Sequence, residues 1–332
     1  MDDPAVSVCI PTYNYANFLP RAIESILGQT HRDLELIVVD DASTDNTDEV
    51  VEQYKSDPRF RYLKNDPNLG LFANFNYCAT LARGEYLKFL CADDWLAPEF
   101  VAETLALLKA HPNVGLVTNS HVLVTEEEQP RTIEYAPFDG RDVIDREDAV
   151  DQLIDWHYVI GRPTNVLLRK EIFQDVGGFD AAFSPTGDLQ LWLKILQNHD
   201  LGAVREPRCF VRSHSSKTHD FADDPTEAVF RVWEAAAERP GALVTPPRLK
   251  RALNREATRC TVFAIDAALH GHFDHAKKVW GYTRRHISLP RFIPAFLAST
   301  PRIARNFATR MVATRTGRYL LIDPTARLGP PL

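Results

Sequence analysis

Three polar clusters in the N-terminal third of the chain carry side chains that can do chemistry. They are Pro11-Thr12-Tyr13-Asn14, Asp40-Asp41-Ala42-Ser43 and Asp93-Asp94. A carboxylate can accept a hydrogen bond from the ring N–H of a uracil or guanine base, and two aspartates beside a diphosphate can hold Mg²⁺ or Mn²⁺. A single Asp in such a place is more often a helix cap or turn residue. Three clusters at successive strand ends favour a binding site instead.

The elements around these clusters explain why they should meet. Apolar runs predict strands, and helical spacing between them predicts helices. This βα alternation is typical of an α/β fold with a doubly wound, mixed but mostly parallel sheet and helices on both faces. Ligands of such sheets bind beyond the carboxyl ends of the strands. The predicted strands cover residues 6–10, 34–39, 61–63, 85–90 and 114–119, and the predicted helices cover residues 18–27, 46–54, 71–82 and 98–110.

The second half of the chain has a different pattern. A polar stretch at 125–139 precedes weaker signals, and after about residue 224 only amphipathic helical patterns remain. We therefore expect two domains, 1–222 and an all-helical C-terminal region at 223–332. The expected later elements are helices at 145–154 and 188–197, extended segments at 163–168 and 208–212, and helices at 248–270 and 272–286.

Several classes of protein are excluded or disfavoured by absent patterns. There is no GxGxxG and no GxxxxGK[ST], so the dinucleotide-binding and P-loop readings lack their phosphate loops. No run reaches the ~18 uninterrupted apolar residues of a membrane span, and the acidic start does not resemble a secretory signal. The five cysteines show no paired spacing, which fits a reduced, cytoplasmic protein.

Longer motifs, in order, resemble glycosyltransferase family 2. The resemblance covers about residues 4–217 and implies the GT-A nucleotide-sugar fold and inverting sugar transfer. The motifs are Val6-Ser7-Val8-Cys9-Ile10-Pro11-Thr12-Tyr13-Asn14, Ile37-Val38-Val39-Asp40-Asp41-Ala42-Ser43-Thr44-Asp45, Asn68-Leu69-Gly70, Asn76, Ala82-Arg83-Gly84-Glu85-Tyr86-Leu87, Asp93-Asp94, Gly177-Gly178-Phe179-Asp180, Asp188-Leu189-Gln190-Leu191-Trp192-Leu193 and Arg212-Ser213-His214.

For the donor, the resemblance implies that Asp41 binds the base, while the neighbouring Asp40 could exchange roles with it. A nucleoside-diphosphate sugar is then the partner, with UDP or dTDP favoured over GDP. Trp95 is a candidate platform for a sugar ring, because an aromatic face stacks on C–H groups. The other positions expected to line the donor site are Pro11, Thr12, Asn14, Asn68, Gly70, Asn76, Ala92 and Asp94.

For the reaction, the resemblance implies that Asp188 is the general base that takes the proton of the acceptor hydroxyl. Asp93 corresponds to the metal-binding Asp of the family's DxD segment, with Mn²⁺ or Mg²⁺ as cofactor, and His214 to an additional metal-contacting residue. Each has a structural alternative. Asp188 could cap the helix that follows, Asp93 could belong to a capped turn, and His214 could be an ordinary hydrogen-bonded side chain.

Two positions depart from the family pattern. The metal segment usually begins with Asp, but here Cys91 holds that place, and the base segment usually reads Glu-Asp, but here reads Gly187-Asp188. Cys91 removes one oxygen ligand. Metal affinity and donor-sugar preference are the properties that these changes affect.

The charge is uneven along the chain. Residues 241–332 hold 16 Lys and Arg against 4 Asp and Glu, whereas residues 1–240 hold 22 against 41. Basic residues at 284–310 alternate with an apolar stripe that includes Phe292, Phe296 and Phe307. This composition is typical of a helix in a membrane interface, which would bring the enzyme to the inner face of the membrane. The alternative is a helical surface that packs on the acidic body or forms a homo-oligomer, and nucleic-acid binding is not expected.

The sequence thus predicts a metal-dependent glycosyltransferase acting on a glycan or lipid-linked acceptor, with a cell-surface polysaccharide as product. Two alternatives remain open. A nucleotidyltransferase would share the strand-end nucleotide pocket and metal carboxylates, but would release pyrophosphate. A sugar-nucleotide or glycan-binding module would have lost catalysis with Cys91 and Gly187.

Overall fold

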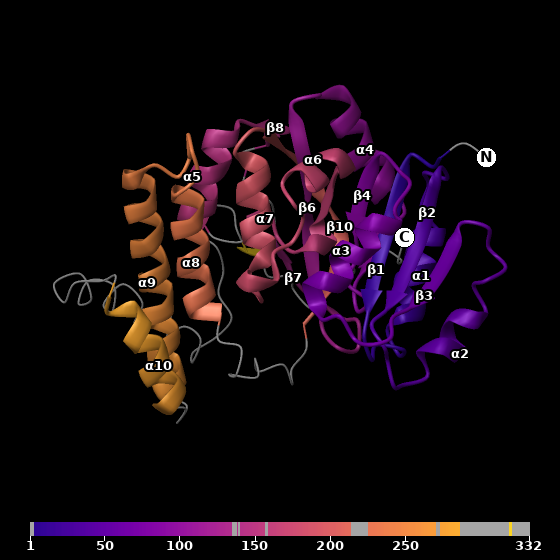
Figure 1. The fold of residues 1–332 in the computed structure, drawn as a ribbon, viewed down its shortest axis with the longest axis horizontal. Helices are drawn as coiled ribbons and strands as arrows, with labels where there is room; N and C mark the ends of the chain where they lie inside the picture. Colours follow the sequence, from indigo (N-terminus) through magenta and orange to yellow (C-terminus); the bar gives the residue numbers. More distant parts are fainter. Residues whose placement is uncertain are drawn as a thin grey trace.

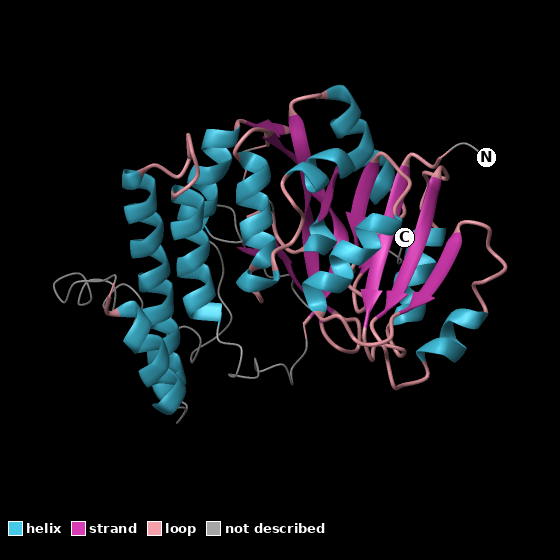
Figure 2. Cartoon of the chain, in the orientation of Figure 1, coloured by secondary structure: helices cyan, strands magenta, loops and turns pink. Residues whose placement is uncertain are grey.

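The computed structural model describes residues 3–134, 138, 140–156, 159–213, 225–269, 273–285 and 319–320. Within these residues, one mixed sheet of 11 strands is covered by helices on both faces (Figure 1 and Figure 2). The expected α/β class is therefore confirmed. None of the described helices combines the length and the apolar run that spanning a membrane requires.

The first half of the sheet is parallel and positions the first two polar clusters. Its order is β4-β1-β2-β3, and Thr12 at the end of one strand pairs with Asp40 at the end of the next. Because parallel strands end at the same edge, the loops after them meet there. The strands are β1 (Val6–Thr12), β2 (Leu34–Asp40), β3 (Phe60–Lys64) and β4 (Tyr86–Phe89).

Successive side chains of the buried strands enter two different cores, as the period of two requires. Val8 and Ile10 pack with one helical layer, whereas Cys9 packs with the other. The first layer contains α1 (Leu19–Leu27), α2 (Thr47–Glu52) and α4 (Phe100–Ala110). The second contains α3 (Leu71–Leu81), α5 (Arg146–Trp156), α6 (Lys170–Asp175) and α7 (Gly187–Leu196).

The second half of the sheet contains parallel and antiparallel strands, but β6 (Val114–Val124) still ends at the same edge of the sheet as β4. β9 (Val166–Arg169) lies antiparallel between β4 and β6, so these two strands run the same way. Leu167 pairs with both Lys88 and Val117, which puts the end of β6 beside the segment after β4. The remaining elements are β5 (Trp95–Leu96), β7 (Pro130–Glu134), β8 (Val143–Ile144), β10 (Asp200–Arg212) and the short 3₁₀ helices η1 (Pro163–Asn165) and η2 (Ala181–Phe183).

The C-terminal helices share a core with the sheet domain. They are α8 (Pro225–Ala237), α9 (Pro246–Leu269) and α10 (Phe273–Thr283). Val232 and Trp233, both almost fully buried, belong to the hydrophobic cluster that also contains α3 and α7. The start of α8 lies close to the expected boundary at 222/223, and this division stays a prediction.

An ionic ladder joins α9 to α5. Arg248 contacts Asp151 at 2.9 Å, Arg251 also pairs with Asp151, and Arg255 contacts Asp155 at 3.5 Å. The basic face at the start of α9 therefore packs on an acidic helix of the body, as the packing alternative predicted. The C-terminal region is not entirely helical, since β11 (Tyr319–Leu320) pairs with β7. Two residues are too few to show a strand period in the sequence.

Candidate functional site

Asp41 lies at the carboxyl edge of β2 and is enclosed by the loop before α3. Its side chain is 3% exposed. Oδ1 accepts hydrogen bonds from Asn65 Nδ2 and the Leu69 N–H, both at 2.8 Å, and Oδ2 accepts from the Gly70 N–H at 2.9 Å. Asn68 closes the loop by donating to the Asp41 carbonyl. Since each carboxylate oxygen can accept about two hydrogen bonds, Oδ2 keeps the capacity for one more.

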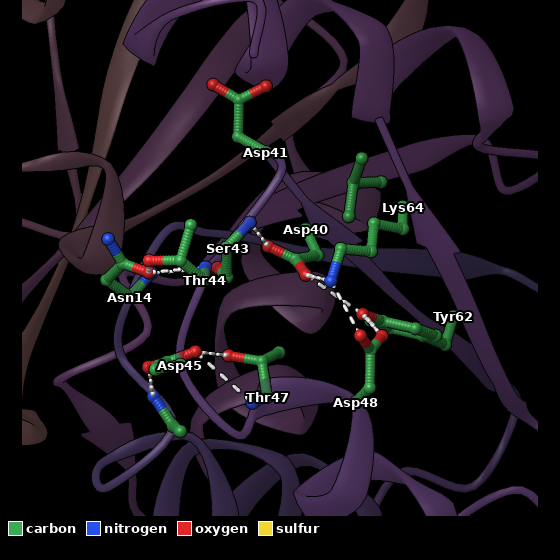
Figure 3. A network of polar contacts seen from close by, with 12 residues as sticks. Asn14, Asp40, Asp41, Ser43, Thr44, Asp45, Thr47, Asp48, Tyr62 and Lys64 are labelled. Atoms are coloured by element: carbon green, nitrogen blue, oxygen red, sulfur yellow. Dashed lines mark hydrogen bonds and ion pairs between the residues drawn. The ribbon is translucent and has the colours of Figure 1, made fainter. Parts of the chain in front are cut away.

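Asp40 points away from Asp41 and serves the fold (Figure 3). Its Oδ1 accepts from the Ser43 N–H at 2.9 Å, and its Oδ2 accepts from the Tyr62 hydroxyl at 2.9 Å and lies 3.5 Å from Lys64 Nζ. The side chain is 0% exposed. It has no surface to offer a nucleotide, so the expected exchange of roles with Asp41 is not supported.

The loop after β1 is tied to the loop after β2. Asn14 adopts a positive φ of 57°, which lets its N–H donate to Ser43 Oγ and its Oδ1 accept from the Thr44 N–H (Figure 3). Thr12 Oγ1 is buried and has no hydrogen-bond partner among the described residues. Tyr13 is 47% exposed beside them, while Pro11 is buried in β1. Thr12 therefore offers an unused polar atom, and Asn14 braces the edge near Asp41.

The segment after β4 gathers three groups that suit a cation. Ligand atoms of Cys91, Asp93 and Asp94 all lie within 4.8 Å of one another. Asp94 is held from two sides, because its Oδ2 accepts from Thr164 Oγ1 at 2.6 Å and its Oδ1 accepts from the Arg212 N–H at 2.9 Å. These bonds leave lone pairs on both oxygens. One thiol and two carboxylates so arranged fit a divalent ion, with sulfur in place of one oxygen.

The protonation of this segment depends on burial. Burial raises the pKa of Asp94 to about 7, and the charge of Asp93 acts in the same direction. Burial also raises the pKa of the Cys91 thiol to about 12, again helped by Asp94 and Asp93. A cation close to these groups would favour their ionised forms.

Asp188 stands in the first turn of α7 and is 8% exposed. Burial raises its pKa to about 6, although the Leu189 N–H donates to its Oδ1 at 2.7 Å. A carboxyl group with a pKa just below neutral suits a general base. The residue before it must be small, since a Cβ on Gly187 would lie 2.6 Å from the Phe72 ring. That contact disfavours any larger side chain at this position while Phe72 stays in place.

Arg162 is a site residue that the sequence pattern did not reveal. Its side chain is exposed, and its charge opposes the rise that burial causes in the pKa of Cys91, Asp94 and Asp188, so it lies in the neighbourhood of all three. The residue lies directly before Pro163, at the start of η1. The only signal in the sequence is an Arg-Pro step in a segment expected to be extended, which does not indicate proximity to an active site.

Lys88 lies beneath the metal segment. Its side chain is 0% exposed, and its Nζ donates to the carbonyls of Pro163 and Thr164 while lying 4.5 Å from the centre of the Phe100 ring. Burial lowers its pKa to about 8. Lys88 thus fixes η1, and Thr164 in turn holds Asp94.

Two expected donor contacts are wrong in this structure. Asn76 donates to the Phe179 carbonyl and accepts from the Phe179 N–H, so both ends of its amide anchor the 177–180 turn on α3. Trp95 is 6% exposed, stacks on Phe210 with ring centres 5.2 Å apart, and receives Arg21 and Arg212 over its ring. With its ring covered by protein, Trp95 cannot carry a sugar.

Other expected residues fall into two groups. Ala92, Asn68 and Gly70 lie at the same edge as Asp41 or Asp94. His214 lies outside the described residues, as do Phe292, Phe296 and Phe307 of the apolar stripe. The last described residue before His214 is Ser213, whose N–H donates to the Val124 carbonyl at the end of β6.

Comparisons with known proteins agree with this geometry. The family model described as Glycosyl transferase family 2 matches residues 7–177. An uncharacterized protein of Mycobacterium tuberculosis (strain CDC 1551 / Oshkosh) is 30% identical over 239 residues, which cover 68% of this chain and 70% of that protein.

Solved structures give the same architecture. The structure of S. aureus TarS 1–349 in complex with UDP-GlcNAc has a TM-score of 0.63 and 18% identity, covering 85% of this chain and 81% of that one. The mannosyltransferase PcManGT from Pyrobaculum calidifontis, in complex with GDP-Man and Mn²⁺, has a TM-score of 0.57 and 20% identity, covering 92% and 81%. At these identities the likeness shows the GT-A fold.

Proposed function

The chain belongs to glycosyl transferase family 2, and from this premise we propose that it transfers a sugar, with inversion, from a nucleoside-diphosphate sugar to a hydroxyl of a glycan or lipid-linked acceptor. One structural connection carries the proposal. The segment 161–164 contacts both carboxyl-bearing elements, because the Trp192 N–H, one helical turn after Asp188, donates to the Gly161 carbonyl at 3.0 Å and the Thr164 hydroxyl donates to Asp94 Oδ2 at 2.6 Å. The segment that would hold the diphosphate and the helix that would hold the acceptor are therefore joined by the same four residues.

The donor end of the site is Asp41. Its remaining acceptor capacity suits the N3–H of uracil or thymine, and for this reason we favour a UDP or dTDP donor. Tyr13 and Leu69, at 47% and 45% exposed, offer apolar surface beside it to the face of a base. Thr12 Oγ1, a buried atom without a partner among the described residues, lies in the same strand end and is a further candidate for a polar contact with the nucleoside. The UDP-GlcNAc complex of TarS supports this class of donor by analogy.

In the reaction, Asp188 accepts the proton of the acceptor hydroxyl as that oxygen bonds to the anomeric carbon. The bond from the anomeric carbon to the diphosphate oxygen breaks from the opposite face, which inverts the configuration. Arg162, as an exposed cation beside both carboxyl groups, is placed to approach the leaving diphosphate. Preorganised charge of this kind stabilises the transition state.

A divalent ion, Mn²⁺ or Mg²⁺, fits the donor set of Cys91, Asp93 and Asp94. When bound, it would neutralise charge on the diphosphate. We also propose His214 as a ligand of this ion. It follows Arg212 by two residues in the sequence, and the Arg212 N–H donates to Asp94 Oδ1. We propose that this transfer is a step in the synthesis of a cell-surface polysaccharide and takes place at the inner face of the membrane.

The deciding experiment is a panel of UDP-, dTDP- and GDP-sugars, tested with and without Mn²⁺. Thermal shift reports binding, because a ligand of the native state raises the melting temperature by mass action. Release of nucleoside diphosphate in the presence of acceptor reports turnover. We expect stabilisation and turnover with a uridine or thymidine donor. Binding without turnover favours the binding-module alternative, and release of pyrophosphate from a nucleoside triphosphate favours a nucleotidyltransferase.

A further inference from the structure

A small cavity lies between α7 and α8, which run side by side in Figure 1. Its volume is about 80 Å³. Phe183 and apolar side chains of both helices form most of the wall, and three polar residues complete it: Gln190, Lys194 and Arg239. None of these residues takes part in the proposed transfer reaction.

Two of the three polar groups are cations that form no ion pair with a described residue. Lys194 is 9% exposed, and its Nζ donates to the Gly178 carbonyl at 3.2 Å, which leaves further N–H groups unused. The guanidinium of Arg239 has no hydrogen bond or ion pair with any residue that the structure describes, and burial alone lowers its pKa. Burial and the charge of Arg239 both lower the pKa of Lys194, so the two cations repel each other. Asp180 acts on Lys194 in the opposite direction but forms no ion pair with it among the described residues.

The third polar group is an unpartnered amide. Gln190 is 7% exposed, and its buried Oε1 has no hydrogen-bond partner in the described part of the chain. Rotation of the amide about its last bond presents N–H donors to the cavity instead. A buried polar atom without a partner costs free energy, and so does a pair of desolvated like charges. Both costs point to a missing anionic ligand.

We propose that this cavity binds a tetrahedral oxyanion, either inorganic phosphate or the phosphate group of a monoester. At roughly 10–15 Å³ of such space for each water molecule, the cavity has room for a group of that size. Lys194 and Arg239 supply charge-assisted donors from two different helices, and Gln190 supplies a neutral donor between them. The Arg231 guanidinium, over the Phe183 ring at 5.4 Å, adds positive charge to the rim.

The anion would join the C-terminal helices to the helix that carries Asp188. Gln190 and Lys194 belong to α7, and Arg239 follows the end of α8. An anion in the cavity would be attracted to both Lys194 and Arg239, and it would therefore hold α7 and the end of α8 together. Binding is therefore expected to stabilise the native protein, whether or not the sugar transfer proposed above takes place.

The test is thermal unfolding of the full chain in a buffer without phosphate or sulfate. Inorganic phosphate or glycerol 1-phosphate is then added at 10 mM, with KCl at equal ionic strength as reference and saturating UDP present throughout to occupy the donor site. We expect phosphate to raise the melting temperature by about 2–4 °C over KCl, on the order of what a ligand at ten times its Kd produces. A shift with both ligands assigns the cavity to phosphate monoesters as well, and a shift with phosphate alone assigns it to the free anion.

Three variants and a matched control localise the effect. Arg239→Gln and Lys194→Gln should abolish the phosphate-dependent shift yet be at least as stable as the wild type without phosphate, because the repulsion is gone. Gln190→Leu, which leaves both charges in place, should weaken the shift. Lys277→Gln, an exposed cation on α10, is the control and should keep it. The proposal is overturned if KCl matches phosphate, if the shift survives in both charge variants, or if those variants are less stable than the wild type without phosphate.

Discussion

Thr164 and Asp94 are 70 residues apart in the chain, and the Thr164 hydroxyl donates to Asp94 Oδ2 at 2.6 Å. The same hydroxyl accepts from the Cys91 N–H at 3.3 Å, so it joins both ends of the metal segment. Lys88 fixes the Thr164 backbone from below. The geometry of the expected cation site thus depends on a threonine that is not one of its ligands.

Replacing Thr164 with Val should weaken metal and donor binding while preserving the fold. The variant keeps the shape of the side chain but removes the hydrogen bond to a carboxylate, which is worth about 1.5–3 kcal/mol, or roughly 10–100-fold in affinity. Calorimetric titration with Mn²⁺ and UDP measures the loss. Thr80→Val removes an exposed hydroxyl whose one hydrogen bond within the described part of the chain goes to the Tyr77 carbonyl, and it serves as the control. Unchanged affinity in Thr164→Val would show that Asp94 does not need this support.

Asp188→Asn should lower turnover by roughly 10²–10⁴-fold and leave donor affinity nearly intact. Because burial raises the pKa of Asp188 to about 6, the wild-type rate should rise with pH through about 6 as the base ionises. The rate of the variant should lose this dependence. Steady-state kinetics between pH 5 and 8 test both points, and wild-type turnover in the variant would assign Asp188 to the helix end alone.

The same substitution should also stabilise the protein at neutral pH. A carboxyl group with a folded-state pKa above its unfolded value contributes stability below the unfolded pKa and loses it as pH rises through about 6. At pH 8 the wild type therefore bears a cost of up to about 3 kcal/mol that Asp188→Asn avoids. Denaturant unfolding of both proteins at pH 5 and pH 8 measures it. An equal difference between them at the two pH values would contradict the expectation.

Asp40→Asn and Asp41→Asn should fail in different ways. Asp40 is fully buried against Ser43, Tyr62 and Lys64, so its substitution should reduce the free energy of unfolding by about 1–3 kcal/mol. Asp41→Asn should in addition weaken UDP binding about tenfold or more, since an amide nitrogen in the place of Oδ2 can accept neither from the base nor from the Gly70 N–H. Urea unfolding and UDP titration on both variants separate the roles. Loss of UDP affinity in Asp40→Asn at full stability would reverse the assignment.

Membrane association through the C-terminal basic region is testable by co-sedimentation with vesicles. If residues 288–332 lie in the interface, the chain should bind anionic vesicles at low salt, bind neutral ones weakly, and release as salt screens the headgroups. Changing Arg302, Arg305 and Arg310 together to Gln should reduce binding. The matching change of Arg248, Arg251 and Arg255 is not a suitable control, because these residues pair with α5. Absence of binding at low salt would leave the region as a packing or oligomer element.

Much of the fold was predictable from local pattern. The buried runs before Thr12, Asp40 and Cys91 predicted parallel strands, and parallel strands place their ends at one edge whatever the loops between them do. The family motifs added the order of these elements and the position of Asp188. The spacing of apolar residues and the residues that end strands and helices are local properties. A sequence therefore determines them without reference to tertiary contacts.

Tertiary structure alone decided which side chains at that edge are available. Asp40 and Asp41 are identical neighbours in the sequence, but they point in opposite directions, so one is consumed by Tyr62 and Lys64 while the other faces the loop before α3. Asn76 and Trp95 match the expected chemistry yet are used by Phe179 and Phe210. Whether a polar or aromatic group is free depends on partners far away in the chain.

The same reason explains what the sequence could not reveal. Arg162 enters the site only because η1 packs between the ends of β4 and β6, and the basic start of α9 is neutralised only because α5 lies against it. The cations of the cavity, Lys194 and Arg239, are 45 residues apart and meet through the packing of α7 on α8. The sequence by itself determined the elements and the residue types at their ends. The burial and pairing of each charge were decided by long-range packing, because these depend on distances in space that no local pattern encodes.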